Sequence, residues 1–168
     1  PMTWGRTCTL LFTLFLVMPG CNPEKKYCDT QGLWDALTSA NPGDTVLVGK
    51  CRVTGNFGVP AGVSLEGVSR EESIIEGESG EAAISVIPGD PDSRVSNLTV
   101  ESYGTSGIRV QGAGDVIIED VTITSTVGLG IAVDGATNLV ISGVTMTGPV
   151  TPANVDGTSF AGTAARLA

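Results

Sequence analysis

Three polar residues in the second half of the chain could do chemistry together if the fold brings them side by side. They are Gln111, Asp134 and Asp156, spaced by 23 and 22 positions. On adjacent turns of a regular coil, two such carboxylates would lie about 5 Å apart and repel each other. That separation suits the two carboxyl groups of a retaining glycosidase, or a bound cation. The alternative is structural, because both aspartates precede glycine and Asp-Gly is a common turn dipeptide.

Arg109 lies two positions before Gln111 and is a candidate base beside this column. Its alternative role is an exposed charge paired with a carboxylate, which contributes little to stability. The chain contains no histidine, which excludes the usual general base, the usual zinc ligand and every catalytic triad that depends on imidazole. The candidate catalytic residues are therefore Asp134, Asp156 and Arg109, and no metal site is predicted.

The balance of charge limits the partners of the chain. Its 18 acidic and 9 basic residues give a formal net charge of −9 at pH 7, which disfavours nucleic acid and anionic lipid surfaces as partners. The classes of partner that remain are a carbohydrate, a cation or another protein. The stretch from Glu66 to Glu81 is rich in glutamate, and we interpret it as a solvated loop face. A weak calcium site is the alternative, because hard cations prefer carboxylate oxygens; no other cofactor is predicted.

A repeat of 23 residues organises the chain from Arg94 to Gly157. Apolar residues return at this interval in five columns. The columns are Val95–Ile118–Ile141, Leu98–Val121–Val144, Val100–Ile123–Met146, Ile108–Ile131 and Val110–Val133. Self-similarity at a fixed period is typical of a solenoid, in which each coil buries its apolar face against the next.

The segments inside one period are short and alternate apolar with polar residues, which predicts strands and not helices. Gly, Asn, Asp and Ser separate them, as turns require. Three strands per coil would place equivalent residues above one another at the spacing of paired strands, about 4.8 Å. The alternative is a β-sandwich of alternating strands, but sandwich strands do not keep a constant period.

The segments GIRV, GIAV, DVIIEDVTI and NLVISGVTM resemble the coils of the right-handed parallel β-helix, the pectin-lyase-like fold, from Asp44 onward. The resemblance implies an all-β solenoid of about 23 residues per coil. It also implies a groove along the outside of the stack, where lyases of this fold use a basic side chain and calcium, and hydrolases use clustered aspartates. The adjacent aspartates and the Gly-His-Gly motif of the hydrolases are absent here.

The first 20 residues are typical of a secretory leader, with Arg6 followed by the apolar run CTLLFTLFLV. The leader ends in VMPGC, which resembles a bacterial lipobox and predicts lipidation of Cys21. Residues 21–28 would then form a tether, and residues 29–168 the β-helix domain. The chain would be anchored in the bacterial cell envelope, at the outer membrane; the alternative is an ordinary secreted protein.

A short helix over residues 31–40 is predicted, with Asp29 or Thr30 as its cap. Leu33, Trp34, Leu37 and Ala40 are expected on one apolar face. In the family that the chain resembles, such a helix plugs the open N-terminal end of the stack.

Cys28 and Cys51 remain as an even pair in an oxidising compartment, which predicts a disulfide. A bridge between them would stabilise the fold by about 3 kcal/mol. Two free thiols are the alternative, and a metal site is disfavoured because neither histidine nor CxxC spacing is present.

The end of the chain departs from the repeat. Asn154 falls where an inward isoleucine is expected, and residues 157–163 resemble the nucleophile segment of subtilisin-like proteases. Thr163 replaces their proline and no histidine can take the proton, so protease activity is excluded. We expect a fragment of a longer solenoid.

The functional hypothesis is a non-catalytic surface lipoprotein whose β-helix is a rigid scaffold or a binding face for carbohydrate or protein. The alternative is a polysaccharide lyase or glycoside hydrolase of this fold with its active site on later coils.

Overall fold

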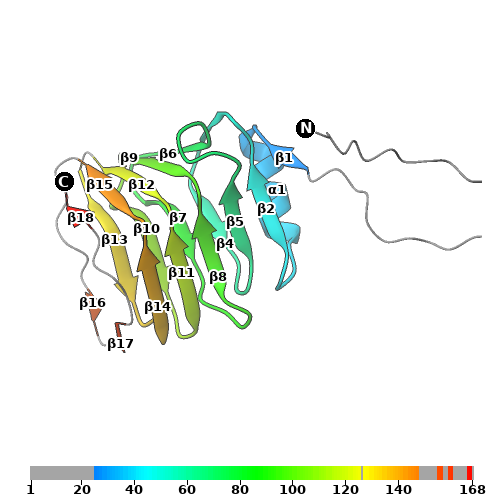
Figure 1. Cartoon of the computed structure of the whole chain (residues 1–168). Helices are drawn as coiled ribbons and strands as arrows, with labels where there is room; N and C mark the ends of the chain where they lie inside the picture. Colours follow the sequence, from blue (N-terminus) through cyan, green and yellow to red (C-terminus); the bar gives the residue numbers. More distant parts are fainter. Residues whose placement is uncertain (1–24, 126, 148–154, 157–158, 161–165, 168) are drawn as a thin grey trace, which may run out of the picture.

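The computed structural model describes residues 25–125 and 127–147, and the backbone of residues 155–156, 159–160 and 166–167. Three parallel sheets wind around one core as a right-handed parallel β-helix, so the predicted fold class is confirmed. Strands of successive coils lie side by side, and helix α1 lies at the N-terminal end of the stack (Figure 1).

Each coil contributes one strand to each sheet. Sheet A contains β1 (Lys26–Tyr27), β2 (Thr45–Val48), β5 (Ser64–Gly67), β8 (Ser93–Ser96), β11 (Asp115–Glu119), β14 (Asn138–Ser142) and β17 (Ser159–Phe160). Sheet B contains β3 (Arg52–Thr54), β6 (Ile74–Gly77), β9 (Thr99–Ser102), β12 (Thr122–Ser125), β15 (Thr145–Thr147) and β18 (Arg166–Leu167). Sheet C contains β4 (Phe57–Val59), β7 (Ala82–Val86), β10 (Ser106–Gln111), β13 (Leu129–Asp134) and β16 (Val155–Asp156).

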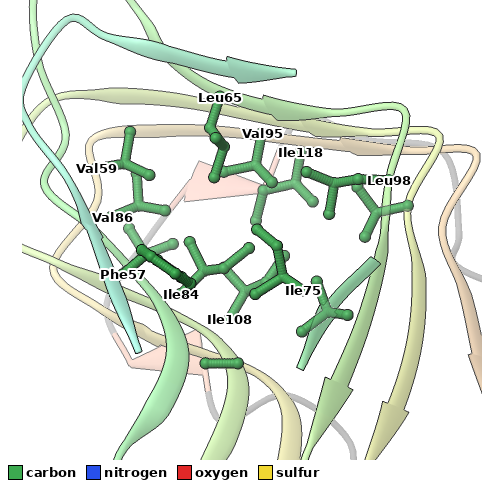
Figure 2. Packing of buried hydrophobic residues seen from close by; sticks show 14 of the residues in the cluster. Phe57, Val59, Leu65, Ile75, Ile84, Val86, Val95, Leu98, Ile108 and Ile118 are labelled. Atoms are coloured by element: carbon green, nitrogen blue, oxygen red, sulfur yellow. The ribbon is translucent and has the colours of Figure 1, made fainter. Parts of the chain in front are cut away.

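The apolar columns predicted from the repeat lie directly above one another. Val95 pairs in register with Ile118, and Ile118 with Ile141. Leu65 extends the column toward the N-terminus by pairing with Val95, and Figure 2 shows Leu65, Val95 and Ile118 along one wall of the core. These side chains are almost completely buried. Because burying one such side chain contributes about 1.5–3 kcal/mol, the stacked columns account for the stability of the coil.

In three successive coils, the corner between sheets A and B is built by one residue in the left-handed conformation. Asn97, Asp120 and Gly143 have φ angles of +53°, +51° and +61°, a region that Asn, Asp and Gly adopt more readily than other residues. The side-chain amide of Asn97 donates to the carbonyl of Gly67 in the preceding coil at 2.7 Å. Asn97 and Asp120 therefore form the turns at this corner.

Helix α1 (Thr30–Ser39) covers the N-terminal end of the core. Asp29 is its cap, and the carboxylate accepts a hydrogen bond from the backbone of Gly32 at 2.6 Å. Leu33 and Leu37 are buried, as expected, because residues four apart lie on the same side of a helix. Trp34 was expected on that face as well, but this was wrong: its side chain is 51% exposed, since it lies about 100° around the helix from Leu33.

Two features at the ends of the stack differ from the predicted boundaries. Lys26 and Tyr27, expected within the tether, form β1 and pair with Leu47 and Val48 at the edge of sheet A. At the C-terminal end Val155 pairs with Val133, 22 residues earlier, and Phe160 pairs with Leu139, 21 residues earlier, so the last coil is one to two residues shorter than the repeat. Asn154, expected to replace an inward isoleucine, lies outside the described residues.

Candidate functional site

The outer face of sheet C carries the polar column predicted from the sequence. Gln111 pairs in register with Asp134, and Asp134 pairs with Asp156. The three residues therefore lie on neighbouring strands β10, β13 and β16, about 4.8 Å apart along the stack. The backbone places Asp156 in this column, while its side chain lies outside the described part of the structure.

Arg109 lies next to this column on the same face. It pairs in register with Ser85 of β7 and Ala132 of β13. With the amide oxygen of Gln111 turned toward it, Gln111 accepts hydrogen bonds from Nε at 3.2 Å and Nη2 at 2.9 Å of Arg109. Within residues 25–125 and 127–147, Arg109 forms no ion pair with a carboxylate.

Two arginines on the other faces are paired with acids. Arg52 donates to both carboxylate oxygens of Glu101 and to Glu76 at 3.3 Å. Hydrogen bonding to Glu101 is the largest influence that raises the pKa of Arg52 above its usual value. Arg94 forms an ion pair with Glu119 of the next coil. The guanidinium of Arg109 therefore differs from these two in having no carboxylate partner among the described residues.

Two open hollows flank Arg109 on the outer face of sheet C. The larger, of about 400 Å³, lies over β10 and β13; the smaller, of about 310 Å³, lies over β7 and β10. The larger hollow is lined by Thr105, Ser106, Arg109, Leu129, Ala132, Val133 and Asp134. The smaller is lined by Gly80, Glu81, Ala82, Ser85, Thr105, Arg109 and Gln111. Arg109 and Thr105 belong to both, so one guanidinium serves both hollows.

Ser106 is a feature of the larger hollow that the sequence did not reveal. The side chain is 1% exposed, and within the part of the chain that the structure describes its Oγ has no hydrogen-bond partner. Strand alternation fails at the start of β10, because Ser106, Gly107 and Ile108 are buried in succession. A buried hydroxyl without a partner is uncommon in native proteins and calls for an explanation.

Two exposed apolar side chains lie in the turns that lead from sheet B into sheet C. Tyr103 lies between β9 and β10 and is 45% exposed; Val127 lies between β12 and β13 and is 77% exposed. Each of them lies two residues before a residue that lines the larger hollow, Thr105 or Leu129. Along the chain, these exposed apolar side chains are therefore close to the polar hollow.

Sheet B has a second polar column that sequence reasoning missed. Arg70 lies in the loop between β5 and β6, and its guanidinium donates to Thr122 at 2.9 Å and Thr145 at 2.7 Å. Thr99, Thr122 and Thr145 stack in register, and Thr99 donates to the carbonyl of Arg70 at 2.7 Å. The spacing of these three threonines by 23 residues could have revealed this column from the sequence. Because Arg70 is engaged by these threonines, we assign it a structural role.

The predicted disulfide is present. Cys28 and Cys51 are bonded, with Cα atoms 5.7 Å apart, and the bridge ties the segment before α1 to the turn between β2 and β3. Cys21, the predicted lipidation site, lies outside the described residues, as does most of the segment 157–163.

The acidic stretch from Glu66 to Glu81 is not one solvated loop, because it includes the end of β5 and all of β6. Glu76 in β6 bonds Arg52, and Glu72 forms an ion pair with Lys50 at 2.7 Å. Among the residues described, no three His, Cys, Asp or Glu side chains come together as a metal site. The described residues also contain no helix long and apolar enough to cross a membrane.

Comparison with curated proteins and with solved structures gives no match. A family model described as a right-handed beta helix region matches residues 36–149. This match begins in α1 and ends after β15, so it includes the paired strands of all three sheets and both hollows. The family model covers more than half of the chain, and the strand register and the buried core agree with it. The chain therefore belongs to the right-handed β-helix family.

Proposed function

We propose that the outer face of sheet C binds carbohydrate without breaking it, and that the β-helix is the rigid support of this face. One observation carries the proposal: Arg109 has no carboxylate partner among the described residues, and it lines two adjacent hollows. Arg52 and Arg94, on sheets B and A, are instead paired with acids of neighbouring coils. The guanidinium has five N–H donors, and Gln111 accepts from two of them, so three remain for an oxygen-rich ligand.

The chemistry of the two hollows favours a polyhydroxylated ligand. Hydroxyls of Thr105, Ser85 and Ser106 lie together with the amide of Gln111 and the carboxylate of Asp134. These groups offer both donors and acceptors at close intervals. Both hollows are open, and they follow each other across the strands, so a linear chain of sugars could occupy both.

A protein partner is the weaker alternative for this face. The core of a protein interface is enriched in aromatic and apolar side chains and depleted of charge. Here the centre is polar and hollowed, and the exposed apolar side chains Tyr103 and Val127 lie in the flanking turns. An aromatic ring at the edge of a polar groove suits stacking against the apolar face of a sugar.

Lipidation of Cys21 would hold this face at the bacterial cell envelope, at the outer membrane. The basis is the VMPGC sequence after a short apolar run. Several acyl chains on one residue give stable anchoring where a single chain gives only reversible binding. Metabolic labelling with an alkyne fatty acid should mark the wild type and leave Cys21→Ala unlabelled; equal labelling of both would contradict the anchor.

The binding proposal is tested with Arg109→Ala and a matched control, Arg94→Ala. Arg94 is also partly exposed and also lies on a strand, but on sheet A and paired with Glu119. A hydrogen bond to a charged group is worth about 1.5–3 kcal/mol, so Arg109→Ala should weaken polysaccharide binding by about 10–100-fold. Arg94→Ala should retain wild-type affinity in a glycan array followed by calorimetry. Equal losses in both variants would refute the proposal.

A polysaccharide hydrolase or lyase is the second candidate, and the register of Asp134 with Asp156 favours it. Carboxylates on neighbouring strands have a separation close to that of a retaining pair, about 5–5.5 Å. In a lyase of this fold Arg109 would be the base. The test is release of shorter or unsaturated products from polysaccharides that bind. Product formation that Asp134→Asn abolishes would replace the binding proposal by the enzymatic one.

A further inference from the structure

Ser106 lines the larger hollow, and none of the described residues forms a hydrogen bond with its hydroxyl. It is 1% exposed and lines the hollow together with Arg109 and Asp134. The other buried serines for which hydrogen bonds are described behave differently: Ser73 donates to the carbonyl of Val48, and Ser93 to that of Ile87. Ser106 is therefore an exception that its own coil does not satisfy.

The groups around Ser106 define what a ligand must offer. Arg109 can only donate hydrogen bonds, the ionised carboxylate of Asp134 can only accept them, and the hydroxyl of Ser106 can do either. A ligand that satisfies all three must present lone pairs and O–H groups on adjacent atoms. Two neighbouring hydroxyls of a sugar ring, a vicinal diol, have this property.

The charged side chains around this site favour a neutral sugar over an acidic one. A sugar carboxylate would bond Arg109 but would face Asp134 in the same hollow, and Glu81 lines the adjoining hollow. A sugar ammonium group would face Arg109 instead. The two described carboxylates outnumber the one guanidinium, and the whole chain carries a net charge of −9. Because these carboxylates repel the carboxylate of a uronate, a neutral ring is favoured over a uronate.

The apolar part of the hollow also fits a sugar ring. Leu129 is partly buried and lies one coil above Ser106, with which it pairs in register. Its side chain can cover the C–H face of a ring whose hydroxyls point toward Arg109 and Asp134. The volume of about 400 Å³ falls within the range of small-molecule sites, about 300–1,000 Å³.

We propose that the hollow over β10 and β13 is a subsite for the vicinal diol of a neutral hexopyranose unit, with Ser106 bonding one of its hydroxyls. This inference rests on the proposed carbohydrate-binding function and narrows it to neutral sugars. It assigns Ser106 a role in ligand binding and Asp134 the role of rejecting uronates.

Isothermal titration calorimetry of the purified chain tests the selectivity with two probes: oligosaccharides from neutral mannan and oligogalacturonates. The mannan oligosaccharides should bind at least tenfold more tightly than the oligogalacturonates. Asp134→Asn should reduce this preference at least fivefold by admitting uronates. Asp115→Asn removes the same charge on sheet A, where Asp115 accepts from Asn138 at 2.6 Å, and should leave the preference unchanged.

Ser106→Ala tests the subsite directly. It should weaken mannan binding at least fivefold while its melting temperature stays equal to or above that of the wild type. Wild-type affinity in this variant, or tighter binding of oligogalacturonates than of mannan oligosaccharides by the unmodified chain, would overturn the diol subsite. Uronate binding that Arg109→Ala abolishes would overturn this inference and leave the proposed function standing. Failure of both probes to bind would overturn both.

Discussion

Two buried serines allow a stability test of whether Ser106 lacks a partner in the free protein. Ser93 and Ser106 each lie in a strand, with 0% and 1% of their surface exposed. Ser93 Oγ accepts from the backbone of Gly62 at 2.9 Å and donates to the carbonyl of Ile87 at 2.7 Å. Ser106 Oγ has neither kind of contact within the described residues. Alanine removes the same single oxygen at both positions, so the loss of volume is matched.

The expected effects have opposite signs. Ser93→Ala removes two hydrogen bonds, each with a net contribution of about 1 kcal/mol, and should destabilise the fold by about 2 kcal/mol. Ser106→Ala removes a buried hydroxyl without a bond, whose burial costs about 1 kcal/mol, and should stabilise the fold by that amount. In a domain of this size 1 kcal/mol shifts Tm by about 2–4 °C, so the two variants should melt about 6–12 °C apart.

Thermal unfolding followed by circular dichroism, with urea titration at one temperature, measures both variants against the wild type. The reasoning is refuted if Ser106→Ala loses as much stability as Ser93→Ala. That result would mean that the Ser106 hydroxyl is already satisfied in the free protein, and the structural basis for its role in ligand binding would be lost.

The remaining predictions concern the frame of the molecule. Replacing Cys28 and Cys51 together by serine opens a cross-link that spans 23 residues, and should lower the free energy of unfolding in urea by about 3 kcal/mol. Ile118→Ala, at a position with 0% exposure, should lower it by about 2–5 kcal/mol in the same assay. Hydrogen bonding from Lys50 lowers the pKa of Glu72, so any stabilisation is complete above the unfolded-state pKa and is lost as the pH falls through the folded-state pKa. Because both side chains are exposed, Glu72→Gln should only slightly reduce the fall of the urea unfolding midpoint as the pH is lowered.

The core of the solenoid was predictable because equal intervals place residues in equal environments. Val95, Ile118 and Ile141 stack in register as their spacing required. The corner residues Asn97 and Asp120 were predictable for a related reason, since the same backbone conformation recurs in each coil. One period of sequence therefore contains most of the information about the next coil.

Features that depend on a break in the pattern were not predictable. Alternation fails at the start of β10, where Ser106, Gly107 and Ile108 are all buried, and nothing in the local sequence marks that break. Trp34 was placed on the wrong side of α1 because apolar character alone does not fix the direction of a side chain that lies between two faces. The lack of an ion pair between Arg109 and any described carboxylate depends on the positions of several coils at once, which a single sequence does not show.

Stacking in register places like charges on neighbouring strands, where they repel each other. Whether the protein neutralises them with its own side chains distinguishes structural charges from candidate binding groups. Glu76 and Glu101 pair directly on sheet B, where two carboxylates would repel each other, and Arg52 bonds both. On sheet C, Asp134 and Asp156 stand in the same relation, yet Arg109 forms no ion pair with Asp134. A column that the protein neutralises by itself has little left to offer a ligand. The column beside Arg109 keeps donors and acceptors that a bound sugar can use, which is why the site is assigned to this face and not to the more highly charged one.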